Sequence, residues 1–209
     1  LAVAGGIATL PVMGSRATYL AGGFGGLQGR GLRGGDLLPV GPVAAGGHLA
    51  ARAGRLLPEH LLPAYSDWPA VAVIAGPQQE AFSAEGLEAF YGGEYSVSPT
   101  ADRMGYRLEG PEVAHCDSES ATPGGIISDG IPLGAVQVPG GRQPIVMMAD
   151  RQTTGGYAKI AVVASADIPL LAQCVPGKSS VRFERTSVEE AQRRYRRLVG
   201  GLERWAGLG

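Results

Sequence analysis

The sequence has little of several residue types, and each shortage excludes a class of protein. Only Cys116 and Cys174 are cysteines, too few for a disulfide scaffold and not at the spacing of a metal site. No apolar run approaches the ~18 residues of a membrane helix. The formal net charge is −1, so nothing global attracts nucleic acid or an anionic membrane. We therefore expect a cytoplasmic protein without nucleic-acid or membrane partners.

Histidine, lysine and asparagine are also scarce. The three histidines, His48, His60 and His115, are isolated in the sequence. Neither an H-E-x-x-H nor a G-x-S-x-G motif occurs, so metal catalysis and serine hydrolysis are unsupported and no metal site is expected. Asparagine is absent, and Lys159 and Lys178 are the only lysines beside 16 arginines. This is typical of GC-rich codon bias, so the abundance of arginine carries little functional weight.

Glycine is in excess, with 34 residues, and is accompanied by 15 prolines. Many turns between short elements favour a mainly β fold with a few short helices (α+β) over a helical bundle. Apolar or alternating segments predict strands at 71–76, 94–98, 126–128, 135–138, 144–149, 159–165 and 181–186, with another after the charged turn at 100–110. Residues 1–8 also look like a strand, and a start inside a strand suggests a fragment.

Capping signals predict three helices. Ser83 suits the N-cap of a helix that stops at Gly92, and Asp167 lies near the cap of a short helix at 165–173. Ser187 and Glu190 form a capping box. The helix they open carries an apolar stripe of Val188, Ala191, Tyr195, Leu198, Leu202 and Trp205. We expect a β-rich domain at 1–186 with the helix 187–209 docked on it, and arginines on the solvated face, paired at i,i+4 with glutamates. A nucleic-acid or membrane contact is the less favoured alternative.

Two phosphate-binding patterns fail. The Gly-Lys-Ser at 177–179 lacks the first glycine of a phosphate loop and lies between a helix and a strand. The glycine-rich segment 22–32 is one residue too long for a dinucleotide fingerprint, and no helix follows it. It is either a turn that needs positive φ or an anion-binding nest beside Arg30.

Polar residues gather between predicted strands in two segments. The segment 98–107 holds Asp102, Arg103 and Arg107. The segment 150–161, DRQTTGGYAKIA, is longer than a plain hairpin turn requires. Its hydroxyls, bare glycine amides and lysine predict a site for phosphate, carboxylate or a developing oxyanion.

Six blocks, in order, read LAVAGGI, MGSRATYL, GGFGGLQGRGLRGGD, SVSPTADRMGYRLEG, IISDGIPLGAVQVP and QPIVMMADRQTTGGYAKIA. Together they closely resemble the biotin-dependent carboxyltransferase family, also called allophanate hydrolase subunit 2, KipA-like proteins or the C subunit of 5-oxoprolinase. The resemblance covers Leu1 to about Glu190. It implies cyclophilin-like β-barrel subdomains of the carboxyltransferase A/B type. It also implies a further N-terminal segment, so we expect this truncated chain alone to be inactive.

The resemblance implies a subunit of an ATP-dependent 5-oxoprolinase, a hydrolase that opens a cyclic amide to glutamate. This C subunit works with an A subunit plus a KipI-like B subunit, and ATP is the cofactor of the complex. One alternative is a carboxyltransferase that moves a carboxyl group from carboxybiotin to urea or a similar amide. The other is a non-catalytic KipA-type regulator that binds a KipI-like kinase inhibitor. No biotinyl-lysine motif or ATP-grasp region occurs, which favours the 5-oxoprolinase role.

Both chemistries build negative charge on a carbonyl oxygen and move a proton at nitrogen. The expected catalytic residues are Asp150 or Asp102, acting as a base or orienting one, with Tyr157 as a donor and Lys159 as an oxyanion cation. The expected substrate or anion ligands are Thr153, Thr154, Gly155, Gly156, Arg103, Arg107 and Arg30, with the two arginines of segment 98–107 clamping a carboxylate. The alternatives are structural: Asp150 caps its own loop, Arg103 pairs with Asp102, and Lys159 lies on the surface.

Overall fold

The computed structural model describes residues 2–43, 53–116 and 124–207, and the chain divides into two compact units, Leu1–Leu56 and Leu57–Gly209. The sequence suggested a different division, at residue 186. The C-terminal helix contacts the strand at 70–75 and belongs to the same unit as the barrel.

The first unit is built around a short hairpin of β1 (Thr18–Tyr19) and β2 (Phe24–Gly25). Gly25 has a φ of +74°, and a Cβ there would lie 2.3 Å from the carbonyl oxygen of Ala17. The glycine-rich segment is therefore a turn that needs positive φ, which was one of the two expected readings. Of the strand expected at 1–8, the described residues 2–8 form only an isolated bridge between Ile7 and Val40, because Gly5 and Gly6 adopt φ of +81° and +68°.

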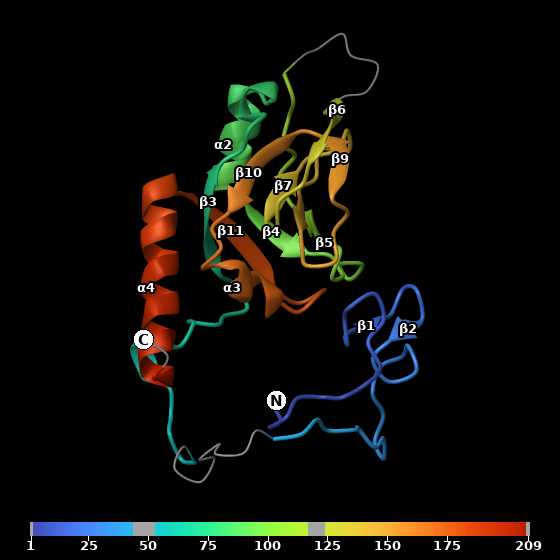
Figure 1. Cartoon of the computed structure of the whole chain (residues 1–209). Coiled ribbons are helices and arrows are strands. Elements are labelled where there is room, and N and C mark those ends of the chain that lie inside the picture. The colour runs from blue at the N-terminus through green and yellow to red at the C-terminus, as the bar shows by residue number, and fades with distance from the viewer. Residues whose placement is uncertain (1, 44–52, 117–123, 208–209) are drawn as a thin grey trace. The chain divides into compact units, whose positions relative to one another are not determined.

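The second unit is a closed barrel of seven strands in the order β10-β3-β11-β4-β5-β8-β7 (Figure 1). Their bounds are β3 Ala70–Ala75, β4 Glu94–Val97, β5 Gly105–Glu109, β7 Ala135–Gln137, β8 Ile145–Met147, β10 Lys159–Val163 and β11 Ser180–Arg185. Neighbouring strands are antiparallel except β11 and β3. Six of the seven lie on segments predicted to be strands, whereas β5 falls within the segment 100–110, which was expected to be a turn with a strand after it. The strands confirm a mainly β fold.

Apolar side chains alternate with other side chains along these strands, and the apolar ones form a core inside the barrel. Phe183 of β11 stacks on Phe90, with ring centroids 4.5 Å apart, and Tyr95 of β4 lies beside them. Phe90 comes from α2 (Ala84–Gly92), whose N-cap Ser83 accepts a hydrogen bond from the Gly86 amide, as expected. The remaining short elements of this unit are the 3-10 turns η1 (Glu59–Leu61) and η2 (Gln79–Ala81).

A separate two-stranded ribbon lies beside the barrel (Figure 1). It pairs β6 (Gly125–Gly130) with β9 (Thr154–Tyr157). Only Ala158 separates β9 from β10, so the ribbon runs directly into the barrel. The segment 150–161 was expected to be a loop, and the structure corrects this. Residues 154–157 of this segment form a strand because they pair with β6, which lies about thirty residues earlier in the chain.

The C-terminal helix α4 (Val188–Ala206) stands alongside the barrel (Figure 1). Ser187 accepts a hydrogen bond from the Glu190 amide, which confirms the predicted N-cap. The apolar stripe is only partly covered: Ala191 is buried, whereas Val188 and Tyr195 are 46% and 48% exposed. Among the helices that the structure describes, none is both long and apolar enough to cross a bilayer.

The pairing of the α4 arginines differs from the expected i,i+4 pattern. Arg193 pairs with Glu190 at i,i+3. Arg194 reaches Asp167, which precedes α3 (Ile168–Ala172). Asp167 occupies the N-cap position of α3, in agreement with the expected place near the cap, although its side chain makes no capping hydrogen bond. Its carboxylate instead accepts a hydrogen bond from the Ala72 amide of β3 at 2.7 Å, and so it ties α4 and α3 to the barrel.

Candidate functional site

One row of side chains crosses four neighbouring strands on the outer surface of the barrel. The strand register pairs Arg107 with Ile145, Ile145 with Gln137, and Gln137 with Lys159. Directly paired residues project from the same face of a sheet. Val146 and Val136, the neighbours of Ile145 and Gln137, are fully buried in the core, so the row points away from it. Residues far apart in the sequence thus become adjacent.

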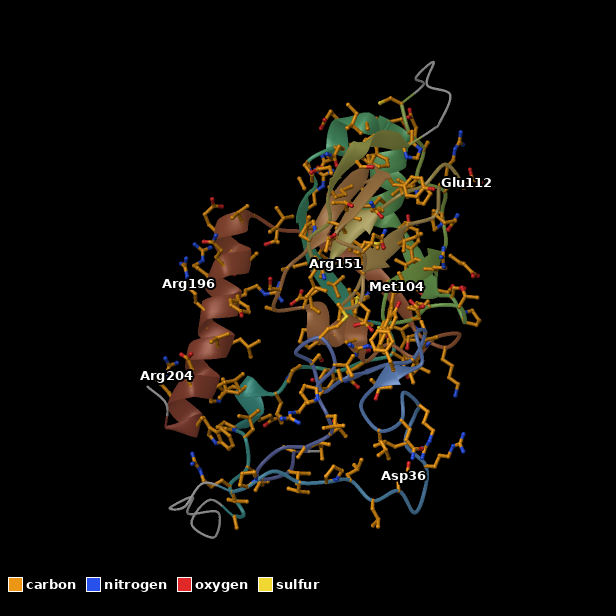
Figure 2. All side chains as sticks on the ribbon, turned by 45° about the vertical axis from the view of Figure 1, so that its right-hand side comes forward. Asp36, Met104, Glu112, Arg151, Arg196 and Arg204 are labelled. Atoms are coloured by element: carbon orange, nitrogen blue, oxygen red, sulfur yellow. The ribbon has the colours of Figure 1, made fainter. Side chains whose placement is uncertain are left out.

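A cavity of about 450 Å³ lies over this row, within the usual range for small-molecule sites. Its lining residues are Thr100, Asp102, Met104, Gly105, Arg107, Gln137, Pro139, Ile145, Met147, Gln152 and Tyr157. The floor comes from β5, β8 and β7. Tyr157 and Gln152 form one side, and the turn that carries Asp102 and Met104 forms another (Met104 is labelled in Figure 2). We refer to this as the row cavity.

The row cavity brings together three of the predicted site residues: Asp102, Arg107 and Tyr157. It also contains Gln137 and Gln152, which sequence reasoning missed. Gln137 is a polar residue in the otherwise apolar segment 135–138 and is only 2% exposed. Its amide nitrogen donates to the carbonyl oxygen of Tyr157 at 3.3 Å. A lone amide in a buried strand was the signal available in the sequence.

Asp102 shapes the turn at the edge of the row cavity. Its Oδ1 accepts hydrogen bonds from the amides of Met104 and Gly105 at 2.9 and 3.1 Å. No described residue donates to Oδ2, which leaves that oxygen open to a ligand. The alternative in which Asp102 pairs with Arg103 is wrong, because Arg103 turns to another acid.

Arg103 and Asp150 form a two-pronged ion pair. The Nε–Oδ2 and Nη2–Oδ1 distances are 2.8 and 3.0 Å. The hydrogen bond from Arg103 lowers the pKa of Asp150, which makes this carboxylate a weaker base than an ordinary aspartate. Neither residue lines the row cavity. The expected roles of Asp150 as a base and of Arg103 as a substrate clamp are therefore not supported by the geometry.

Arg30 is also occupied. It holds Asp36 through two hydrogen bonds of 2.8 Å, and this pairing places the pKa of Asp36 well below its usual range. Both residues belong to the first unit, where the pair closes the turn after the hairpin. Arg107 differs from Arg103 and Arg30, because no carboxylate among the described residues pairs with it.

Gly155 and Gly156 do not form the expected loop of bare amides, nor do they form an anion-binding nest. Both lie in β9, and Gly155 pairs with Asp129 of β6. A nest needs backbone that alternates between right- and left-handed conformations, whereas neither glycine has a positive φ. Thr154 is exposed in the same strand, and Thr153 lines a neighbouring hollow of about 620 Å³. Arg151 lines that hollow too (labelled in Figure 2) and donates to the Ile131 carbonyl at 2.9 Å.

Lys159 is neither on the surface nor open to a ligand. Its side chain is 1% exposed, and Nζ lies 3.0 Å from Oδ2 of Asp129 on β6. Gln78 bonds both residues: its Oε1 accepts from the Lys159 amide, and its Nε2 donates to Asp129. The lysine, at one end of the row, therefore joins the ribbon to the barrel. Within the described ranges, no three of His, Cys, Asp or Glu are grouped as they would be around a metal ion.

Sequence comparison places these features in a known family. The family described as "Carboxyltransferase domain, subdomain A and B" matches residues 1–185. The chain is 40% identical over 192 residues to the C subunit of 5-oxoprolinase from Escherichia coli K12, covering 91% of this chain and 57% of that protein. It is 31% identical over 197 residues to a putative urea carboxylase of Emericella nidulans, covering 91% of this chain and 15% of that protein.

A solved structure agrees with these matches. The K. lactis urea amidolyase superposes with a TM-score of 0.84 at 26% identity, over 98% of this chain and 13% of that one. The chain thus spans little more than half of its 5-oxoprolinase relatives and a small part of the urea-metabolising enzymes. Fold, sequence and residue range agree: the chain belongs to the family of carboxyltransferase domains with subdomains A and B.

Proposed function

We propose that this chain is part of a subunit of an ATP-dependent 5-oxoprolinase. The reaction takes 5-oxoproline, ATP and two waters to glutamate, ADP and phosphate. One water adds across the ring C–N bond and the other ends on phosphate. We further propose that it works with an A subunit plus a KipI-like B subunit, and that ATP enters through the complex. The identities of 40% and 35% to two bacterial 5-oxoprolinase C subunits support this choice.

The observation that carries the proposal is the unpaired Arg107 in the row cavity. 5-Oxoproline is a cyclic amide that bears a carboxylate, and an arginine without an acidic partner is suited to bind such a group. Arg103 and Arg30 hold aspartates at 2.8 Å, so they are less available. In this arrangement Arg107 binds the substrate carboxylate and fixes the orientation of the ring.

The other cavity residues fit the amide end of the same substrate. Tyr157, which is 43% exposed, and the amide of Gln152 donate to the ring carbonyl oxygen as negative charge develops there. Such donors commonly contribute about 3 kcal/mol each in a dry site. Oδ2 of Asp102 accepts the ring N–H and orients the nitrogen that receives a proton when the ring opens. Lys159 acts indirectly, by holding the ribbon that presents Tyr157.

Substitution of Arg107 tests the proposal in the complex reconstituted from the full-length protein that carries this chain and its partners. Arg107→Gln should reduce kcat/KM for 5-oxoproline by about 10- to 100-fold, the usual effect of losing a charged hydrogen bond. Arg142→Gln is the matched control, since Arg142 pairs with Glu112 on the surface. An unchanged kcat/KM in Arg107→Gln would remove the carboxylate-binding role.

The similarity to urea amidolyase supports a second candidate function, the transfer of a carboxyl group from carboxybiotin to urea. Urea has no carboxylate, so this reaction gives Arg107 no substrate anion to bind. Carboxylation of urea that depends on a biotin carrier and bicarbonate, without 5-oxoproline turnover, would establish that alternative. Binding to the KipI-like partner without turnover of either substrate would establish a regulator instead.

A further inference from the structure

A second cavity, of about 350 Å³, lies between α4, the start of α3 and η1. We refer to it as the helix cavity. It lies within the second unit and shares no lining residue with the row cavity. The proposed 5-oxoprolinase reaction does not use it.

Arg194 forms one side of the helix cavity, and an ion pair holds its guanidinium group in place. Arg194 of α4 places Nη2 2.5 Å from Oδ1 of Asp167, whose side chain is 3% exposed. The other carboxylate oxygen accepts the Ala72 amide at 2.7 Å. Asp167 is thus satisfied by the protein itself. A guanidinium has five N–H donors, so Arg194, with a side chain that is 37% exposed, retains donors for a ligand.

Two further basic groups line the helix cavity, namely Arg197 of α4 and His60 of η1. Arg194 and Arg197 are three residues apart and so project from the same side of the helix. Across residues 53–116 and 124–207, no carboxylate forms a salt bridge with Arg197. The lining therefore has two guanidinium groups and an imidazole against one carboxylate, an imbalance that favours an anion.

The remaining lining is mostly apolar. Leu62, Leu170 and Leu198 are among the residues that enclose the helix cavity, and Leu62 is 54% exposed. An inorganic anion would leave these surfaces in contact with water, whereas an aliphatic chain would cover them. We propose that the helix cavity binds a small monocarboxylate with a short aliphatic body. The carboxylate contacts Arg194 and Arg197, and the chain packs on the leucines.

Methyl NMR on the leucine-labelled chain tests this, with hexanoate as the probe. Hexanoate should cause saturable shifts at the methyls of Leu170 and Leu198. Arg197→Gln should weaken its binding about tenfold, as expected for a lost charged hydrogen bond. Arg197→Lys, which keeps the charge, should recover part of the loss. Arg204→Gln is the control, because Arg204 lies two turns further along α4 (Figure 2) and outside the lining.

Hexan-1-ol and inorganic phosphate separate the two parts of the proposed ligand. The alcohol lacks the charge and phosphate lacks the aliphatic body, so both should bind more weakly than hexanoate. Phosphate binding at least as tightly as hexanoate would overturn the proposal, and so would equal weakening in Arg197→Gln and Arg204→Gln. Hexanoate without saturable shifts at these methyls would overturn it as well. None of these outcomes depends on 5-oxoproline turnover.

Discussion

At the scale of single residues, the candidate site depends on which charged groups already have partners. The sequence shows Arg103, Arg107 and Asp150 as equivalent candidates. Arg103 and Asp150 are 47 residues apart, yet their side chains form a two-pronged pair. Local sequence cannot reveal such a pair, because chain folding decides which distant charges meet. Arg107 has no carboxylate partner among the described residues.

Removing either partner of the Lys159–Asp129 ion pair should lower the stability of the fold, but by different amounts. Lys159 is 1% exposed, whereas Asp129 is 52% exposed and also bonds the Gly130 amide. Asp129→Ala leaves a buried ammonium without its anion, which is strongly unfavourable. Lys159→Met keeps the buried stem and leaves an aspartate that water still solvates. Urea unfolding should show a larger loss of midpoint for Asp129→Ala than for Lys159→Met, and the reverse order would contradict this account.

The same pair predicts a pH dependence. The hydrogen bond from Lys159 lowers the pKa of Asp129 in the folded protein. A group with a lowered folded pKa stabilises fully above its unfolded pKa, about 4 for aspartate, and loses this contribution as the pH falls through the folded value. The stability advantage over Asp129→Ala should therefore be constant from pH 6 to 8 and shrink below about pH 4. An advantage that grows on acidification would be inconsistent with the pair.

At the scale of elements, α4 was largely readable from the sequence because its signals are local. The capping box and apolar stripe lie within one continuous segment, and both are present. The partners of the stripe come from elsewhere in the chain. For this reason the sequence did not show that Val188 and Tyr195 stay half exposed or that Arg194 leaves the solvated face for Asp167.

Two consecutive glycines in α4 should respond differently to alanine. A Cβ on Gly201 would lie 2.5 Å from Cδ2 of the buried Leu61, whereas a Cβ on Gly200 meets only the flexible end of Arg204 at 3.3 Å. Helix propensity alone favours alanine at both positions by about 1 kcal/mol. We expect Gly200→Ala to stabilise by up to about that amount, and Gly201→Ala to destabilise by about 1 kcal/mol through overpacking. Urea unfolding would contradict this if both substitutions were stabilising.

At the scale of the whole molecule, the apolar core belongs to the second unit. The buried hydrophobic residues of the described ranges begin at Leu61, and Thr9 is the only buried residue described before it. A closed barrel leaves no open sheet edge within its seven strands, and closure removes the need for another strand to complete it.

A chain limited to residues 57–209 should therefore fold on its own. Its unfolding transition in urea should be cooperative, with a slope in proportion to its size. Its amide NMR signals for the barrel strands should superpose on those of the whole chain. Residues 1–56 alone should show no cooperative transition. A 57–209 chain without dispersed amide signals would show that the first unit is required for the barrel.

The sequence by itself determined most of the barrel strands, the capped helices and the family, because alternation, caps and motif blocks are recorded in short stretches of chain. It also supplied Asp102, Arg107 and Tyr157 as candidates. Only the tertiary structure decided that β9 is a strand, that Lys159 is buried against Asp129, and that Arg103 pairs with an acid whereas Arg107, among the described residues, does not. These outcomes depend on pairing between residues tens of positions apart. Strand register and barrel closure set that pairing, and no local pattern encodes it.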